Sequence, residues 1–562
     1  MKRYLFFIFL VLLLAGCRTS QVQDEIEPKP ENIPEEVPQI TREPEERDFA
    51  EMRPGVRNLD ELTVAFTRQN IELDSRKAVY ATEAQLFTGI YVGLFYYHPL
   101  TLAPVPALAE RWVLSEDRML WTFTIRRNAR FSNGDPVRAE DFRSAWLSLL
   151  EPGRDAYYSS FFDIIEGARD FRNGIKTDPE SVGITAADDR TLIVKLNSPA
   201  SYFPALLCHH SFSPIHPSMI DKTDWSPAGT NNWQPPVSNG PFRIDTMNDE
   251  SIVMQKNDQY WDRDRVALNK IIIKFADTPE DASHLWNSGE ARWIAGNVNM
   301  EALTDLSGIQ LNEMFATHYY FIRSEEKPWN DYRVRRAMTL VLPWEEIRNG
   351  YLLPTETLIY PFLGYPKIKG ISESDIEEAL RLMAEAGYEN GEGLPELVIR
   401  LTPSRDAQRV GILMANAWKE ILNFEVRVEV FPFDGYFESL REGGYTIASS
   451  TWIGDFADPY AFLHMFRRDS SLNESRLNDP DYEMLIERSM VEEGQERLAT
   501  LAEAEKILLE RGVVIPVCFI PALNIVDLGE LDGWYLNVLD IHPFKYMNFR
   551  AFRPLPGVAL VR

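Results

Sequence analysis

Apolar and polar positions recur along this chain with two different periods. Residues 120–125 (Leu-Trp-Thr-Phe-Thr-Ile) alternate between apolar and polar, which predicts a strand with one buried face, and 270–275 is apolar enough for a buried strand. The helical period runs through 374–386 and stops before Gly387, a residue that suits a helix C-terminus. Strand and helix patterns alternate throughout without a short repeat. The sequence therefore predicts a mixed α/β fold and not a solenoid or a β-sandwich.

Other predicted elements continue this interleaving. A turn at 132–135 precedes a helix at 139–148, whose first turn carries acidic residues that oppose the helix dipole. A second turn, at 238–241, precedes a strand. We predict further strands at 64–66, 191–196, 242–245, 397–401, 426–430 and 513–519, and further helices at 84–94, 331–342, 407–422, 481–490 and 496–511.

The first 17 residues have the layout of an export signal. Lys2 and Arg3 precede an uncharged apolar run, 4–14, which is shorter than the roughly 20 residues that cross a membrane. Two small residues then lead to Cys17, an arrangement that resembles the lipobox of bacterial lipoproteins. We therefore predict a signal peptide at 1–16 and a lipid anchor on Cys17, which holds the rest of the chain outside the cytoplasm at a bacterial membrane.

Composition separates a tether from a folded body. Residues 17–58 are rich in Glu and Pro and poor in large apolar side chains, so they cannot bury enough surface to fold and are predicted to form an extended acidic tether. The body that follows is long enough for two to four lobes, since 45% of the chain is hydrophobic. A net charge of −27 argues against a nucleic-acid partner, because such partners require a basic face.

Enzyme and metal-site signatures are missing from the sequence. It contains no G-x-S-x-G, H-E-x-x-H or G-x-x-x-x-G-K-[ST] motif, so we predict neither catalysis nor a cofactor. His209 and His210 with His216 form the densest histidine group, which we interpret as structural because acidic or cysteine partners at ligand spacing are lacking. Cys208 and Cys518 both sit in apolar surroundings; they could pair, but two buried free thiols are the favoured interpretation.

Four blocks between residues 106 and 142 carry a family pattern. They read Pro-Ala-Leu-Ala-Glu-Arg-Trp at 106–112, Trp-Thr-Phe-Thr-Ile-Arg-Arg at 121–127, Phe-Ser-Asn-Gly-Asp-Pro-Val at 131–137 and Ala-Glu-Asp-Phe at 139–142. Later blocks agree in the same order, at 237–242, 257–261, 330–337 and 452–459. From about residue 62 to residue 549 the chain resembles the oligopeptide-binding proteins of ABC importers, the family 5 extracellular solute-binding proteins.

The resemblance implies a three-lobed periplasmic-binding-protein-like α/β fold, in which the ligand is enclosed between lobes one and three. It places the strongest block, 106–142, in lobe two, away from the ligand. The implied boundaries are 59–97, 217–315 and 520–562 for lobe one, 98–216 for lobe two and 316–519 for lobe three.

Asp455 is the principal candidate binding residue. In the family it resembles, the Asp of this motif pairs with the free α-ammonium of a bound peptide, and here Asp455 stands among apolar and aromatic residues, where a carboxylate is costly unless a cation accompanies it. The resemblance also implies that Trp452 lines the pocket, that Thr451 offers main-chain groups and that Tyr157 reaches the ligand. The alternatives are a turn or helix cap for Asp455, a core role for Trp452 and a surface position for Tyr157.

Two departures from the family pattern concern the other end of the ligand. Some relatives hold the peptide carboxylate with an Arg three residues before the Trp, a position that is Ser449 here, and with a His that is replaced by Ala407 or its neighbour. The C-terminal end of the ligand is therefore less well specified. Either longer peptides of variable length bind, or a different ligand does.

The predicted function is that of an extracytoplasmic solute-binding lipoprotein that captures peptides by hinge closure and delivers them to an ABC import permease. One alternative keeps the fold and changes the ligand to an oligosaccharide, a nickel chelate or another small solute. A second alternative is a surface adhesin or sensor that does not transport.

Overall fold

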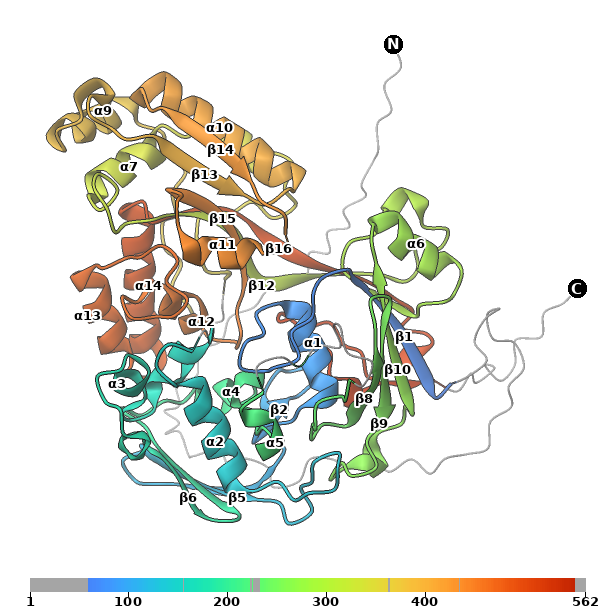
Figure 1. The fold of residues 1–562 in the computed structure, drawn as a ribbon. Helices are drawn as coiled ribbons and strands as arrows, with labels where there is room; N and C mark the ends of the chain where they lie inside the picture. The colour runs from blue at the N-terminus through green and yellow to red at the C-terminus, as the bar shows by residue number, and fades with distance from the viewer. Residues whose placement is uncertain are drawn as a thin grey trace, which may run out of the picture. The chain divides into compact units, whose positions relative to one another are not determined.

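The computed structural model describes residues 59–154, 156–222, 225, 233–361, 364–433 and 435–550. The predicted signal peptide (1–16), Cys17 and the predicted tether lie outside the described residues. Within them, strands and helices alternate along the chain and build the α/β fold that the hydrophobic pattern predicts (Figure 1).

A ten-stranded mixed sheet is the largest element of the fold. Strands β1, β10 and β11 run parallel to one another, as do β13, β14 and β15, and the remaining pairings are antiparallel. In spatial order the strands are β14 (Val426–Val430), β13 (Leu397–Leu401), β15 (Ile447–Ile453), β12 (Ile309–Ile322), β16 (Val514–Val526), β11 (Trp293–Ala295), β1 (Glu61–Thr67), β10 (Lys270–Ala276), β9 (Ser251–Lys256) and β8 (Phe242–Met247).

Two long strands join the two halves of this sheet. We call β11, β1, β10, β9 and β8 the β1 half, and β13, β14 and β15 the β15 half. The end of β12 pairs with β15, whereas the end of β16 pairs with β11, so both long strands pass from one half to the other (Figure 1). Their pairing is irregular between Glu313 and Thr317, which places a break in the ladder between the halves.

A separate four-stranded antiparallel sheet forms the centre of what we call the small-sheet region, residues 98–216. Its strands, in spatial order, are β4 (Ala109–Leu114), β5 (Leu120–Ile125), β7 (Thr191–Lys195) and β6 (Ile184–Asp188). Two short pairs complete the strands: β2 (Phe95–Tyr97) with β3 (Pro104–Pro106), and β17 (Leu531–Asp532) with β18 (Asn548–Phe549).

Helices pack against these sheets: α2 on β6 and β7, α6 on β1, β10 and β11, and α10 on β13 and β14. The α-helices are α1 (Ala81–Ile90), α2 (Ala139–Leu149), α3 (Ala168–Arg172), α4 (Phe203–Leu206), α5 (Pro217–Ile220), α6 (Pro279–Asn287), α7 (Tyr332–Leu340), α8 (Trp344–Arg348), α9 (Ile376–Glu385), α10 (Arg405–Leu422), α11 (Tyr436–Glu442), α12 (Tyr460–Leu463), α13 (Pro480–Ser489) and α14 (Gly494–Glu510).

The predicted elements are present, and the differences lie at their ends. Helix α1 begins before the predicted residue 84, because the Glu83 carboxylate accepts the backbone N–H of Tyr80 at 2.9 Å and caps the first turn. It ends at Ile90 and not at residue 94, since Tyr91 turns to extended backbone with φ −124° and ψ 153°. Strand β16 continues to Val526, beyond the predicted end at residue 519, because its second part pairs with β11 and β12.

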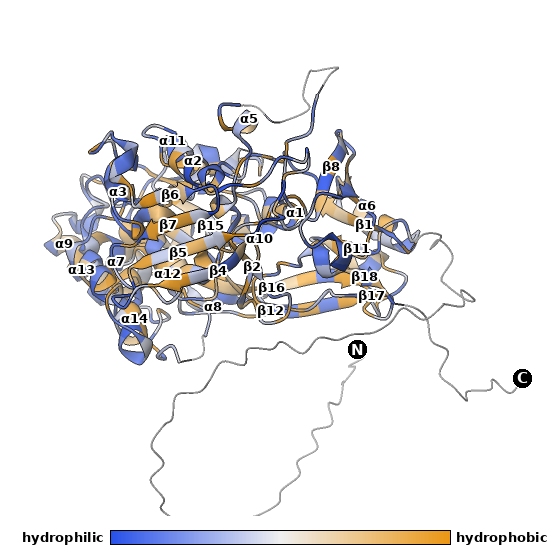
Figure 2. Cartoon of the chain, turned by 90° about the horizontal axis from the view of Figure 1, so that it is seen from below, coloured by the Kyte–Doolittle hydropathy of each residue, from blue (hydrophilic) through white to orange (hydrophobic). Residues whose placement is uncertain are grey.

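The core lies between the sheets and their helices, where apolar strand faces meet. Strands such as β7 and β16 carry much of the orange in Figure 2, whereas exposed helix faces carry much of the blue. Trp146, Trp293 and Trp418 are among the largest fully buried side chains. Cys208 and Cys518 are both free, as favoured from the sequence, although Cys208 is only partly buried.

Candidate functional site

A cavity of about 530 Å³ lies where the β1 half, the β15 half and the small-sheet region meet. Its volume falls within the range of ordinary ligand pockets. All four predicted binding residues, Asp455, Trp452, Thr451 and Tyr157, line this cavity. The folding therefore brings together residues almost 300 positions apart in the sequence.

Aromatic side chains dominate the wall of this cavity. They come from all three parts of the fold, which leaves an apolar interior with few charges. The aromatic lining consists of Phe66, Tyr80, Phe87, Tyr91, Phe95, Tyr96, Tyr97, Tyr157, Tyr158, Tyr260, Trp293, Phe433, Tyr436, Phe437, Trp452 and Tyr546.

Local backbone packing fixes the position of Asp455, which follows β15 by two residues. The Gly454 N–H donates to the carbonyl of Phe315 at 2.8 Å. A Cβ atom at Gly454 would meet the Phe315 ring at 2.2 Å, so only glycine allows this close approach. The Tyr97 hydroxyl donates to the Asp455 carbonyl at 2.7 Å. The chain around Asp455 is thus held from two sides at the cavity wall.

The Asp455 carboxylate is buried and lacks a compensating cation in the described chain. Its side chain is 11% exposed, and Oδ2 has no hydrogen-bond partner among the described residues. Oδ1 lies 3.5 Å from His209 Nε2, but burial lowers the pKa of His209 to about 3, which keeps that ring neutral. Burial likewise lowers the pKa of nearby His464 to about 4. For the same reason burial raises the pKa of Asp455 to about 7, despite opposing contributions from His464 and Tyr158.

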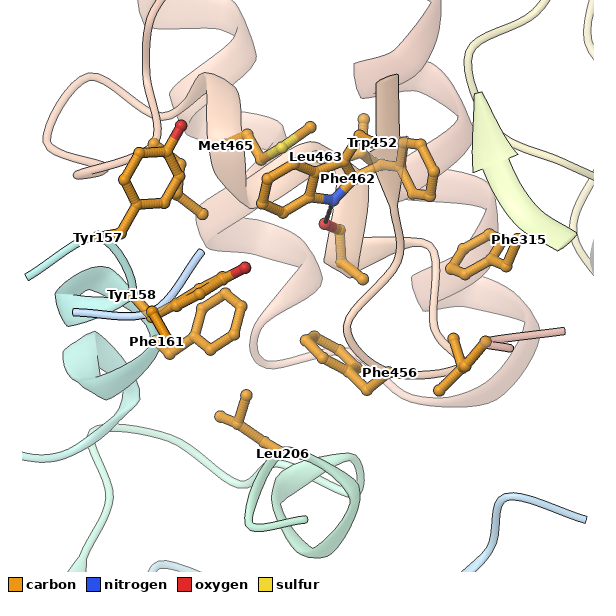
Figure 3. Close-up of a cluster of buried hydrophobic side chains, with 14 of the residues drawn as sticks. Tyr157, Tyr158, Phe161, Leu206, Phe315, Trp452, Phe456, Phe462, Leu463 and Met465 are labelled. Atoms are coloured by element: carbon orange, nitrogen blue, oxygen red, sulfur yellow. Dashed lines mark hydrogen bonds between the residues drawn. The ribbon is translucent and has the colours of Figure 1, made fainter. Parts of the chain in front are cut away.

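Trp452 combines a structural and a lining position. Its side chain is buried, and the indole Nε1–H donates to the carbonyl of Ala461 at 3.0 Å. Figure 3 shows the indole among Phe462, Leu463 and Met465, with this hydrogen bond dashed. The core role considered from the sequence is therefore present, and the ring also faces the cavity.

Thr451 and Tyr157 differ in exposure. Thr451 is exposed on β15, and its hydroxyl lies 2.9 Å from Nδ1 of its cross-strand neighbour His318. Tyr157 is only 5% exposed, so it is not a surface aromatic. The Arg441 guanidinium lies 4.5 Å from the centre of its ring, and Ser471 donates to its carbonyl. In Figure 3, Tyr157 and Tyr158 come from a different segment than Trp452.

Several lining residues were missed by the sequence interpretation. His209 and His210, interpreted as structural, line the cavity, with their ring centres 4.0 Å apart. His216 lies elsewhere, 3.0 Å from Asp135. The apolar stretch before His209 was the only signal, and apolar surroundings are equally typical of core histidines. In the described part of the chain, no group of three or more His, Cys, Asp or Glu residues is arranged to hold a metal ion.

Aromatic contacts also join two distant segments that both line the cavity. The Tyr80 ring lies 5.7 Å from Phe433 and 5.6 Å from Phe437, centre to centre, which connects the α1 segment to the segment that leads into α11. Nothing in the sequence placed these segments near one another.

The two family departures leave the cavity poor in cations. Ser449 lines it as a buried neutral residue that contacts the Tyr436 hydroxyl, and Ala407 is buried. Among the described lining residues, Lys545 is the only lysine or arginine, and it is paired with Asp262 at 2.6 Å. The cavity therefore offers a ligand a buried carboxylate, but its described lining residues include no lysine or arginine that is free of an ion pair.

Comparison with known proteins agrees with this geometry. The family model described as bacterial extracellular solute-binding proteins, family 5 Middle, matches residues 103–474. This chain belongs to that family. The resemblance inferred from the sequence blocks is thereby confirmed.

Relatives of this solute-binding protein extend over most of its length. It is 28% identical to the oligopeptide-binding protein OppA of Bacillus subtilis over 437 residues, which are 74% of this chain and 79% of the relative. It is also 28% identical to the dipeptide-binding protein DppE of the same species, covering 80% of this chain and 83% of the relative. A solved periplasmic oligopeptide-binding protein of Borrelia burgdorferi is similar with a TM-score of 0.76 and 25% identity, covering 87% of this chain and all of the other.

A prokaryotic membrane lipoprotein lipid attachment site matches residues 1–17 of this solute-binding protein. The predicted lipoprotein signal is therefore confirmed, and the protein is lipid-anchored outside the cytoplasm. None of the helices in the described ranges is long and apolar enough to cross a membrane. The family and its relatives are solute-binding proteins, not enzymes.

Proposed function

We propose that this solute-binding protein captures peptides in the aromatic cavity and holds their free α-ammonium on Asp455. The observation that carries the proposal is the buried carboxylate whose Oδ2 lacks a partner in the described chain. A ligand ammonium supplies both the missing charge and the missing hydrogen-bond donor. The oligopeptide-binding function of the named relatives supports the same ligand class.

The rest of the peptide runs along β15 in this proposal. Thr451 is exposed on that strand beside the cavity, so its backbone groups are available to an extended chain. Affinity then comes from groups that every peptide has. Side chains enter the space between the aromatic rings of Trp452, Tyr157 and their neighbours.

Ligand uptake proceeds by closure of three lobes about a hinge. We assign 59–97, 217–315 and 520–562 to lobe one, 98–216 to lobe two and 316–519 to lobe three. The break in the pairing of β12 with β16 supports a hinge between lobes one and three. In this proposal the contacts of Tyr80 with Phe433 and Phe437 hold lobe one against lobe three in the closed state, and a ligand stabilises this state by binding it more tightly than the open one.

Delivery to a membrane ABC permease completes the proposed function. The lipid anchor and the acidic, proline-rich segment 17–58 keep the binding body near the membrane and raise its effective concentration at the permease.

Substitution of Asp455 tests the proposal. Asp455→Asn keeps the shape but removes the charge, so calorimetry with a tripeptide library should show about 10- to 100-fold weaker binding of free-amine peptides. N-acetylated peptides should bind the two forms alike. Asp540→Asn is a matched control, since Asp540 lines the same cavity but already accepts hydrogen bonds from Asn524 and His542. Equal loss in both variants, or no binding of any peptide by the folded protein, contradicts the proposal.

A second candidate keeps the cavity and changes the ligand to an oligosaccharide or another small solute. The aromatic lining favours it, because sugar rings stack on aromatic faces. Mass spectrometry of ligand extracted from the purified protein separates the two candidates.

A further inference from the structure

A second, polar cavity of about 250 Å³ shares Tyr157 with the aromatic cavity as a lining residue. It is large enough for several waters or one small organic molecule. We call it the charged cleft, and its ionisable lining consists of Glu151, Arg154, Arg172, Arg441, Glu474 and Arg476.

Three of the six ionisable lining residues of the charged cleft form ion pairs with described residues. Arg154 pairs with Glu151 at 2.7 Å, and Arg172 pairs with Asp163 at 2.7 Å. Arg476 and Glu474 form no direct ion pair with a described residue, although the charge of Arg476 acts on Glu474 from a distance, as do the charges of Arg441 and Arg323. Glu474 is 8% exposed, and its Oε2 lacks a hydrogen-bond partner in the described chain. A buried acid and a nearby base thus face the same small space without contacting one another.

This combination selects one ligand chemistry. A guanidinium binds a carboxylate, and a carboxylate oxygen without a partner requires an N–H donor. A solute that fits both carries a carboxylate and an N–H group a few bonds apart. Free amino acids have this chemistry, and so does the C-terminal residue of a peptide.

Tyr157 separates the charged cleft from the aromatic cavity. Its ring lines both spaces, with the Arg441 guanidinium 4.5 Å from the ring centre. Glu474 and Trp452 also line a small void of about 20 Å³ beside Tyr157, so the two spaces are nearly continuous around this ring. A solute in the cleft therefore contacts a residue that also faces the aromatic cavity.

We propose that the charged cleft is a second binding site, in which Arg476 binds the carboxylate and Glu474 the N–H donor of an amino acid or of a peptide C-terminal residue. The amino-acid source is independent of the proposed function, whereas the peptide source rests on it. Either source gives the protein a basic anchor that the aromatic cavity does not provide.

Calorimetric titration of the full chain with glycine, acetate and methylamine at constant ionic strength tests the free-solute source. We expect glycine to bind more tightly than acetate and methylamine not to bind. Arg476→Gln should weaken glycine about tenfold or more, since it removes a charge-assisted hydrogen bond. Glu474→Gln should weaken glycine but strengthen acetate, because it removes a repulsion. Arg154→Gln is the matched control and should change glycine binding less than twofold, as Arg154 is already paired.

The peptide source is tested with tripeptides that end in a free carboxylate or in an amide. If the C-terminal residue enters the cleft, Arg476→Gln weakens only the free-carboxylate form, and glycine competes only with that form. If glycine binds but no peptide does, the cleft stands and the proposed peptide function fails. The proposal is overturned if glycine does not bind and Arg476→Gln leaves both tripeptides unchanged, or if Arg476→Gln and Arg154→Gln have equal effects on glycine.

Discussion

The two spaces on either side of Tyr157 manage charge in opposite ways. The aromatic cavity contains a buried carboxylate, Asp455, surrounded by rings and neutral histidines. The charged cleft contains several guanidinium and carboxylate groups, of which Glu151, Arg154 and Arg172 form ion pairs. In the aromatic cavity a single buried carboxylate therefore carries the unfavourable electrostatic free energy, whereas in the charged cleft this energy is shared among several charged groups. We therefore expect substitutions to change the free energy of unfolding more at Asp455 in the cavity than at the paired residues of the cleft.

The largest expected effect is a gain of stability in Asp455→Asn without ligand. The pKa of Asp455 is raised to about 7 in the folded chain, so between about pH 4 and pH 7 the folded state keeps a proton that the unfolded state has released. Stability is therefore lost as the pH rises through this window, by up to about 4 kcal/mol above pH 7. Asn carries no ionisable carboxyl group, so the variant does not lose this stability as the pH rises. Urea unfolding should show the gain at pH 8 and none near pH 4; a loss at pH 8 would refute the comparison.

Peptide affinity should depend strongly on pH for the same reason. The ammonium requires ionised Asp455, so affinity should fall about tenfold per pH unit below 7, or about 100-fold from pH 7 to pH 5. Calorimetry with a free-amine tripeptide measures this, and its N-acetylated form should change little. A flat profile between pH 8 and pH 5 would show that Asp455 is not the ammonium partner.

Arg441→Gln tests the contact between Arg441 and Tyr157, the residue that lines both spaces. It removes the cation–π contact with Tyr157 and should lower the free energy of unfolding by about 1 kcal/mol. Arg441→Lys keeps a cation and should lose less. The midpoint of thermal unfolding measures both variants. Equal losses would mean that the contact with the ring contributes nothing.

The smallest effect is expected at the rim of the charged cleft. Arg154 pairs with Glu151, but the two side chains are 23% and 56% exposed, so Arg154→Gln should change stability by less than about 0.5 kcal/mol. The same urea measurements apply. If Arg154→Gln lowered the free energy of unfolding as much as Arg441→Gln, the exposed ion pair would contribute no less than the contact with Tyr157, and the comparison would be wrong.

Much of the fold follows from patterns that are local in the sequence. Alternation places β5 at its observed residues, and Gly387, with φ +89°, follows α9 as expected for a helix end. The second part of β16 was missed, because its pairing with β11 depends on a strand more than 200 residues away. Pairing between strands that are far apart in the sequence does not change the local pattern of apolar and polar residues, so that pattern could not predict it.

The candidate site shows the same division. Asp455 and Trp452 stand in one motif, so the resemblance points to both of them. His209, Tyr80 and the charged cleft come from segments that meet only in the folded chain, and their residues have no distinctive spacing. Arg476 and Glu474 are ordinary in sequence and become notable only because the fold places both on one cleft and buries Glu474 Oε2 without a partner among the described residues.

Gly454 connects the aromatic cavity to the irregular stretch of β12 between the two halves of the large sheet. Its N–H donates to Phe315, which lies inside the irregular stretch of β12 between Glu313 and Thr317, and Phe315 in turn donates to Val538. A force that a ligand exerts on the neighbouring Asp455 reaches this stretch through this backbone hydrogen bond and through the pairing of β15 with β12. In the proposed function, the residue that binds the ligand ammonium is therefore separated from the proposed hinge by one peptide bond and one backbone hydrogen bond. A side chain in place of Gly454 would clash with the Phe315 ring. It would therefore be expected to disturb both the proposed lobe closure and the binding of the ligand at Asp455.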